Sequence, residues 1–142
     1  MMKKLIVLMG NIGTGKTNYR NITYVNGEII VCPDDWRMSK KQSHTKIFSD
    51  IEKGLREDRT VVVDGINIKR KDRDQLLYFA KRAKCPAILI DFGPGNDDSL
   101  KRRINDSPDT SAEEWTFYHL ENLRNYEKPL QEEGFDEIIS RY

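Results

Sequence analysis

Residues 5–17, LIVLMGNIGTGKT, join a short apolar run to a glycine-rich loop that ends in lysine and threonine. Leu5 to Met9 is a continuous apolar run of strand length, the pattern of a strand buried on both faces of a parallel sheet. The loop GNIGTGKT has a glycine, four residues, then Gly-Lys-Thr, and the residues after it can form a helix. This order of strand, loop and helix predicts a phosphate-binding loop, or P-loop.

The residue types in the loop suit the binding of a nucleoside triphosphate. Gly13 and Gly15 let backbone N–H groups point inward, which forms an anion site at the start of a helix. Lys16 is expected to reach the β- and γ-phosphates, and Thr17 to place its hydroxyl on a magnesium ion. The alternative is a tight turn followed by a chance Lys-Thr pair. The loop therefore predicts ATP and Mg²⁺ as bound groups, with ATP held by Gly10, Asn11, Ile12, Gly13, Thr14, Gly15, Lys16 and Thr17.

Length and composition exclude several classes of protein. The 142 residues predict a single domain over residues 1–142. Charged residues make up 33% of the chain but nearly cancel to a net charge of +1, so a nucleic acid partner would need a local basic patch. Cys32 and Cys85 are too few and too far apart for a disulfide framework or a zinc site, which fits a reducing cytoplasm. The apolar run of five residues is too short for a signal sequence or a membrane span.

Apolar runs and helical stripes alternate along the rest of the chain. After the P-loop and the helix that opens with KTNYRN, strands are predicted at residues 27–32, 60–64 and 87–92 and around 138–139, and helices at 43–57, 76–83, 97–105 and 111–128. This order predicts an α/β architecture with a parallel sheet flanked by helices. In the last helix, one face carries Trp115, Tyr118 and Tyr126, and another carries Phe117, Leu120 and Leu123. Most of these residues are expected to pack in the core, although one exposed aromatic residue that stacks on a base is an alternative.

Two acids and an arginine follow the second predicted strand, in the stretch PDDWR. Ligands of open α/β sheets bind at the C-terminal ends of the strands, so Asp34, Asp35 and Arg37 are expected to face the bound triphosphate. There they would supply a general base and an anion anchor. A polar turn with a helix cap is the alternative.

Two predicted strands end in aspartate, VVVD at Asp64 and ILID at Asp91, and either matches the Walker B pattern that orients magnesium. The residue after Asp64 is Gly65, where motor ATPases usually have a glutamate that polarises water. The guanine motif Asn-Lys-x-Asp of GTPases is absent from the sequence. Both observations favour phosphoryl transfer over nucleotide hydrolysis.

Two basic clusters complete the set of candidate residues. Lys101–Arg103 follows the fourth predicted strand, where small P-loop kinases carry a lid whose arginines offset charge in the transition state. Lys69–Arg73 follows Asn67 and would either contact an acceptor's phosphates or lie on the surface. For the first cluster, a solvated helix face is the alternative. His44 and His119 lack metal-ligand spacing and are expected to be structural or surface residues.

Several separated motifs together resemble the 5′-hydroxyl polynucleotide kinases, especially the phage enzymes and the kinase domain of polynucleotide kinase phosphatases. The matching stretches cover almost the whole chain and are GNIGTGKT, PDDWR, DGINIKRKDR and YEKPLQEEGFDEII. The resemblance implies an adenylate-kinase-like P-loop fold and transfer of the γ-phosphate of ATP to the 5′-hydroxyl of DNA or RNA. It also implies a setting in nucleic acid repair.

The resemblance also implies roles for individual residues. Asp34, the first acid of its pair, would take the proton from the acceptor hydroxyl, and Arg37 would bind a phosphate of the acceptor strand. Asp35, Asp64 and Asn67 would lie on the acceptor side. Arg102 or Arg103 would be the first lid arginine, whereas the second lid arginine of the family has no counterpart in INDSPDTSAEE, and Ile66 replaces a common threonine.

The absence of an Asp-x-Asp-Gly-Thr phosphatase signature predicts a kinase only. Two other functions remain open at this point. One is a P-loop kinase for a small-molecule hydroxyl on a sugar, nucleoside or antibiotic. The other is a module that binds ATP without transferring phosphate.

Overall fold

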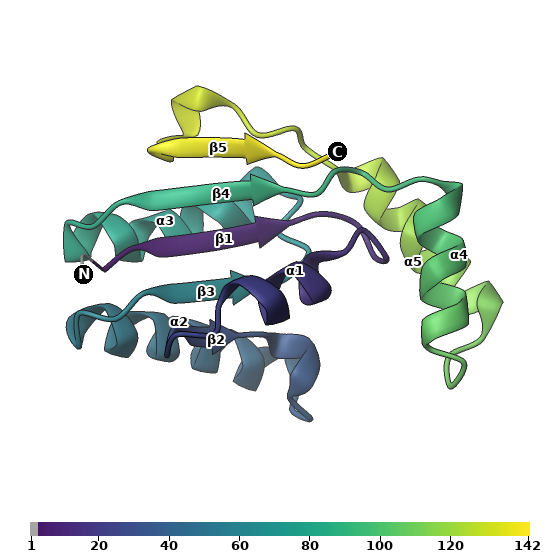
Figure 1. The fold of residues 1–142 in the computed structure, drawn as a ribbon, viewed down its shortest axis with the longest axis horizontal. Coiled ribbons are helices and arrows are strands. Elements are labelled where there is room, and N and C mark those ends of the chain that lie inside the picture. The colour runs from purple at the N-terminus through teal and green to yellow at the C-terminus, as the bar shows by residue number, and fades with distance from the viewer. Residues whose placement is uncertain (1–2) are drawn as a thin grey trace.

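A computed structural model describes residues 3–142, so Met1 and Met2 of the predicted domain lie outside the described residues. Strands and helices alternate along the chain (Figure 1). The elements are β1 (Leu5–Met9), α1 (Lys16–Thr23), β2 (Ile29–Val31), the 3-10 turn η1 (Pro33–Asp35), α2 (Lys40–Arg56), β3 (Val61–Asp64), α3 (Arg70–Ala83), β4 (Ala87–Asp91), α4 (Asp97–Asp106), α5 (Ala112–Asn125), the 3-10 turn η2 (Gln131–Glu133) and β5 (Glu137–Ser140). All five predicted strands are confirmed.

The strands form one parallel sheet in the order β2-β3-β1-β4-β5. Strand β1 lies at the centre, with Leu5 paired to Val61 of β3 on one side and to Ala87 of β4 on the other. Because all strands are parallel, the loops that follow β1, β2, β3 and β4 all emerge at one edge of the sheet. The predicted α/β fold with a parallel sheet flanked by helices is confirmed.

Both faces of the sheet are covered, as the continuous apolar runs require. Leu5, Val7 and Met9 point to the face that carries α2 and α3, where they pack with residues such as Ile51 and Leu77. The opposite face holds a smaller cluster of buried residues against Tyr19 of α1. This second cluster consists of Ile6, Leu8, Val62, Ile90 and Phe92. Packing on both faces of the sheet fixes the ends of the strands, and with them the loops that carry the predicted site residues.

Helices α4 and α5 lie beside each other beyond the C-terminal ends of the strands (Figure 1). Asn96 caps α4 by accepting a hydrogen bond from Ser99 N, as expected for a helix that starts there. Ser111 caps α5 in the same way through Glu114 N. Within residues 3–142, no helix is both long enough and apolar enough to cross a membrane.

Two expectations about α5 are wrong. The helix ends at Asn125 and not at Lys128, because Tyr126 leaves helical geometry and its hydroxyl bonds to Asp91. Phe117, Leu120 and Leu123 do not pack in the core, since their side chains are 60%, 54% and 44% exposed. Helix α5 packs on α4 and the P-loop through its other face and leaves this apolar stripe in solvent.

Candidate active site

The P-loop runs from the end of β1 to the first turn of α1, as the motif predicts. Gly10, Gly13 and Gly15 have φ values of 151°, 71° and 98°, which favour glycine. Gly13 also packs so closely on α4 that a Cβ atom there would lie 2.0 Å from the carbonyl oxygen of Ser99. The glycine at position 13 therefore fixes both the shape of the loop and its contact with α4.

Lys16 is buried and directed at the loop backbone. Its Nζ atom donates to the carbonyl oxygens of Gly10 and Asn11 at 2.8 and 3.0 Å. Burial lowers the pKa of Lys16 to about 8, a shift that the Asp64 carboxylate opposes and the Arg103 guanidinium reinforces. A buried ammonium group with backbone partners only is well placed to be stabilised by incoming phosphate oxygens.

Asp64, at the end of β3, lies next to the first turn of α1. Its Oδ2 atom accepts from the Thr17 hydroxyl at 3.3 Å and from Arg20 Nη1 at 3.0 Å. Burial raises the pKa of Asp64, whereas Lys16 and Arg20 oppose this rise. Asp91, the other candidate for the Walker B position, bonds instead to Tyr126 and to Gly93 N. Of the two aspartates, only Asp64 hydrogen-bonds to the P-loop threonine.

The pair of Thr17 and Asp64 fits a magnesium ion. Both side chains offer oxygen atoms, which Mg²⁺ prefers, and Mg²⁺ usually takes only one or two protein ligands beside phosphates and waters. Across residues 3–142, no group of three or more His, Cys, Asp or Glu residues could enclose a metal by itself. The two side chains therefore suit a cation that is bound together with a nucleotide.

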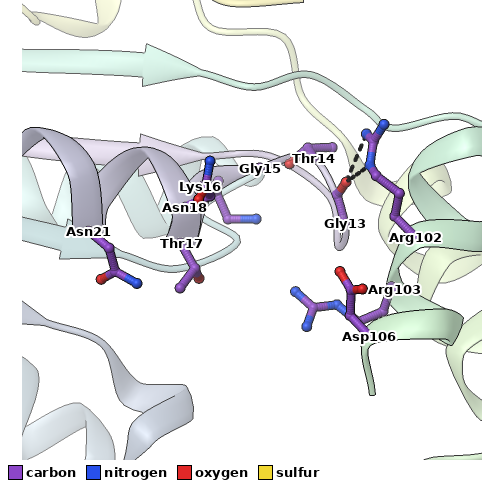
Figure 2. Close-up of a pocket in the computed structure, with 10 residues that line it drawn as sticks. All are labelled: Gly13, Thr14, Gly15, Lys16, Thr17, Asn18, Asn21, Arg102, Arg103 and Asp106. Carbon is purple, nitrogen blue, oxygen red and sulfur yellow. Dashed lines mark hydrogen bonds between the residues drawn. The ribbon is translucent and has the colours of Figure 1, made fainter. Parts of the chain in front are cut away.

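A pocket of about 640 Å³ opens in front of the P-loop, between α1 and α4 (Figure 2). Its lining includes Lys16, Thr17 and the two candidate lid arginines. Arg102 donates to the carbonyl oxygen of Gly13 through Nε and Nη2, at 3.2 and 3.0 Å. Arg103 lies over the Trp115 ring and donates from Nη1 to Ser107 Oγ at 3.3 Å, while its buried Nε has no partner among residues 3–142. Figure 2 shows its guanidinium directed into the pocket. Arg102 thus contacts the loop backbone, while Arg103 faces the open space.

A second pocket, of about 880 Å³, lies between η1, α2, α3, α5 and the loop after β3. Apolar side chains such as Ile47, Phe48 and Leu76 form part of it, and basic residues Lys40, His44, Lys69 and Lys71 also line it. Asp34 and Asn67, both predicted site residues, belong to this lining. The Asp34 carboxylate is also close enough to Lys16 to oppose the fall in its pKa. Asp34 therefore lines the second pocket and is within electrostatic range of the P-loop lysine.

Asp35 and Arg37 are placed differently from Asp34 and Asn67. Asp35 faces Arg20, with 3.8 Å between its Oδ2 and Arg20 Nη1, and does not line the second pocket. It does not cap α2 either, because Ser39 does so. Arg37 is exposed at the turn between η1 and α2, outside the lining of both pockets. Asn67 donates from Nδ2 to the carbonyl oxygen of Leu8 and so ties the loop after β3 to β1.

Two buried polar contacts around the site have no signal in the sequence. Arg73, assigned to a cluster expected to lie on the surface or contact an acceptor, is fully buried, bonds to Glu133 at 2.8 and 2.9 Å and to the carbonyl oxygen of Asn67 at 3.0 Å. Asn11 of the P-loop is also fully buried and bonds to His119 and Asn122 of α5. The spacing of charged or apolar residues carries no signal for the pairing of Arg73 with Glu133 or of Asn11 with Asn122, since these partners are 60 and 111 positions apart.

Comparison with known protein families identifies the chain. The profile of the family described as "Chromatin associated protein KTI12" matches residues 3–142. The chain belongs to the KTI12 family. The sequence motifs led to the same P-loop kinase superfamily, although they did not single out KTI12. No curated protein sequence matches this KTI12-family chain.

Solved structures share the fold at low sequence identity. A fungal RNA kinase superposes with a TM-score of 0.71 at 16% identity over 100% of this chain, which spans 38% of the length of that kinase. Kti12 from Chaetomium thermophilum, in complex with ADP-AlF3, gives a TM-score of 0.65 at 16% identity, with 96% of this chain and 88% of that one covered. A gluconokinase from Sinorhizobium meliloti gives 0.59 at 18% identity, covering 98% and 82%. These likenesses show that the fold is that of P-loop kinases.

Proposed function

We propose that the protein is an ATP-dependent kinase that transfers the γ-phosphate to the 5′-hydroxyl of DNA or RNA. The observation that carries the proposal is Asp34, which lines the second pocket and acts electrostatically on Lys16. A carboxylate that lines a pocket within electrostatic range of the P-loop lysine can take the proton that an attacking hydroxyl loses in phosphoryl transfer. The resemblance to polynucleotide kinases and the fold shared with a fungal RNA kinase support the choice of acceptor.

In this proposal the first pocket holds ATP, with its phosphates on the loop from Gly10 to Thr17. Lys16 exchanges its backbone partners for oxygens of the β- and γ-phosphates, which restores a strong partner to its buried charge. Thr17 and Asp64 would hold magnesium, which neutralises phosphate charge when it is bound. Arg103 contacts the γ-phosphate as charge develops, and Arg102 keeps the loop closed through Gly13.

The second pocket holds the acceptor end. Lys40, Lys69 and Lys71 supply positive charge for its phosphates, and exposed Arg37 binds a phosphate further along the strand. The 5′-hydroxyl gives its proton to the Asp34 carboxylate as its oxygen bonds to the γ-phosphorus. The bond between that phosphorus and the β–γ bridging oxygen breaks, so that ADP and a 5′-phosphate are formed. Asp35 contributes indirectly through its ion pair with Arg20, the partner of Asp64.

A small-molecule kinase is the second candidate, and the size of the second pocket favours it. A volume of about 880 Å³ lies within the range of small-ligand sites. The gluconokinase likeness shows that the fold also occurs in a kinase whose name indicates a sugar-acid substrate. The cytoplasmic location expected from the sequence stays a prediction.

The test is incubation with γ-labelled ATP, magnesium and 5′-hydroxyl oligonucleotides of deoxyribose and ribose type. We expect label at the 5′ end of at least one oligonucleotide and none on the same oligonucleotide that already carries a 5′-phosphate. Transfer to gluconate or a nucleoside, with none to either oligonucleotide, would support the small-molecule kinase. Tight ATP binding without transfer to any acceptor would indicate an ATP-binding module.

A further inference from the structure

Asn11, in the P-loop, is held by side chains and carbonyls from outside the loop. Its Nδ2 atom donates to the carbonyl oxygens of Pro94 and His119, at 2.8 and 3.0 Å, and lies 3.2 Å from His119 Nδ1. Its Oδ1 atom accepts from Asn122 Nδ2 at 3.0 Å and from Ile12 N at 2.7 Å. Every polar atom of this fully buried side chain is therefore bonded, mostly to α5.

The backbone of Asn11 positions the residues that contact phosphate. Its carbonyl oxygen accepts from Lys16 Nζ at 3.0 Å and from the Thr14 hydroxyl at 2.7 Å. The bonds that hold the Asn11 side chain also restrict the position of this carbonyl, to which the lysine and threonine that line the first pocket donate. The link from α5 to Asn11 thus reaches the nucleotide site through two hydrogen bonds in series.

Asn122 also belongs to the wall of the second pocket. Its amide has one further N–H and a carbonyl oxygen available beyond the bond to Asn11. A ligand that bonds to these atoms fixes the orientation of the amide and so favours the bond that holds Asn11. Asn125 lines the same pocket one turn later, but its Nδ2 bonds only within α5, to the Glu121 carbonyl oxygen at 2.9 Å.

We propose that Asn122 is a positioning residue that couples the acceptor pocket to the P-loop, so that an acceptor in the second pocket tightens nucleotide binding in the first. The identity of the acceptor rests on the proposed function, whereas the link between Asn122 and Asn11 does not. Coupling of this kind is reciprocal, so bound nucleotide tightens acceptor binding by the same factor.

The test compares Asn122→Asp with Asn125→Asp. Both substitutions keep side-chain size and add one negative charge to the same pocket, but only Asn122→Asp removes the N–H that bonds to Asn11. Calorimetry measures the Kd of a non-hydrolysable ATP analogue with magnesium, with and without a saturating 5′-hydroxyl oligonucleotide. Thermal melts of each variant record folding, and the pair Asn122→Ala and Asn125→Ala repeats the comparison if an aspartate variant does not fold.

We expect the oligonucleotide to lower the wild-type Kd about fivefold, near the lower end of typical coupling. Asn125→Asp should keep this shift, whereas Asn122→Asp should lose it and bind the analogue alone about three- to tenfold more weakly, as for one lost hydrogen bond. Equal analogue binding by the two variants would overturn the positioning role, and an unchanged wild-type Kd would overturn the coupling. If phosphate is transferred but the oligonucleotide does not change the Kd of the analogue, only this inference is refuted. If Asn122→Asp alone loses the Kd shift but no phosphate is transferred to any oligonucleotide, only the proposed function is refuted.

Discussion

The ammonium group of Lys16 donates to the carbonyl oxygen of Gly10 at 2.8 Å, inside the P-loop, where it is predicted to bind phosphate. Its lowered pKa of about 8 corresponds to about 3 kcal/mol against the buried charge in the free protein. The surroundings of Lys16 thus disfavour its charged form until an anion binds.

Lys16→Met should abolish phosphate transfer without lowering the melting temperature at pH 7. The substitution removes the positive charge on the phosphates, but it also removes a desolvated ammonium group from the fold. Transfer assays measure the first effect and thermal melts the second, with Lys53→Met, at an exposed lysine on α2 outside both pockets, as the control. Near wild-type transfer by Lys16→Met would mean that the loop does not act on phosphate.

Gly13→Ala should weaken ATP binding far more than Gly15→Ala. Both glycines have positive φ, so each substitution strains the backbone by about 1–2 kcal/mol. Only at Gly13 would the new Cβ meet backbone, 2.0 Å from the Ser99 carbonyl oxygen, whereas nothing lies within 4 Å at Gly15. Calorimetry with ATP and thermal melts make the comparison, and equal losses for the two variants would refute the packing argument.

Arg103→Met and Arg102→Met should affect different kinetic constants. Arg103 faces the pocket with an unpaired Nε, so its loss should lower kcat by about 10²- to 10³-fold. Arg102 bonds to the Gly13 carbonyl oxygen, so its loss should mainly raise the KM for ATP. Steady-state kinetics with varied ATP measure kcat and KM for both variants. A lower kcat in Arg102→Met together with a higher KM in Arg103→Met would contradict this assignment of roles.

The fold and the P-loop could be predicted from the sequence because their signals are local. The apolar run before GNIGTGKT and the recurring strands depend on near neighbours in the chain, and Gly10 to Thr17 are fixed by one short motif. The closure of α5 onto the loop could not be predicted, because Asn11 and Asn122 lie 111 positions apart and both are ordinary polar residues.

Other errors have the same origin in tertiary contacts. Phe117, Leu120 and Leu123 have the spacing of a core stripe, but α5 uses its polar residues to reach the P-loop and leaves that stripe exposed. Arg73 stands in a basic cluster like a surface residue, but Glu133 provides a buried carboxylate 60 positions later. The choice between Asp64 and Asp91 also required the structure, since both end a buried strand.

The buried pair of Arg73 and Glu133 should make stability depend on acid pH. Although burial opposes the charge, hydrogen bonds from Arg73 and from Leu130 N hold the pKa of Glu133 below its ordinary value of 4.5. The carboxylate therefore stabilises the fold fully above about pH 4.5, and this contribution is lost as the pH falls through the folded-state pKa.

Glu133→Gln should cost about 3–5 kcal/mol at neutral pH, because it leaves the Arg73 charge buried without its partner. The difference from wild type should shrink below pH 4.5. Urea unfolding at a series of pH values measures it. Glu132→Gln is the matched control, since that neighbouring carboxylate is exposed and lies 3.7 Å from Arg70. A stability difference that does not change with pH would contradict the assignment.

The most direct test of the account is single-turnover phosphate transfer to a 5′-hydroxyl oligonucleotide by Asp34→Asn and Asp35→Asn. Asp34 lines the second pocket, where the acceptor is proposed to bind, and Asp35 faces Arg20, so only Asp34→Asn removes the proposed proton acceptor. We predict that Asp34→Asn slows transfer by about 10²- to 10⁴-fold with little change in ATP affinity, and that Asp35→Asn has a smaller effect. Thermal melts exclude misfolding as the cause. A nearly active Asp34→Asn, with the larger rate loss in Asp35→Asn, would contradict the account.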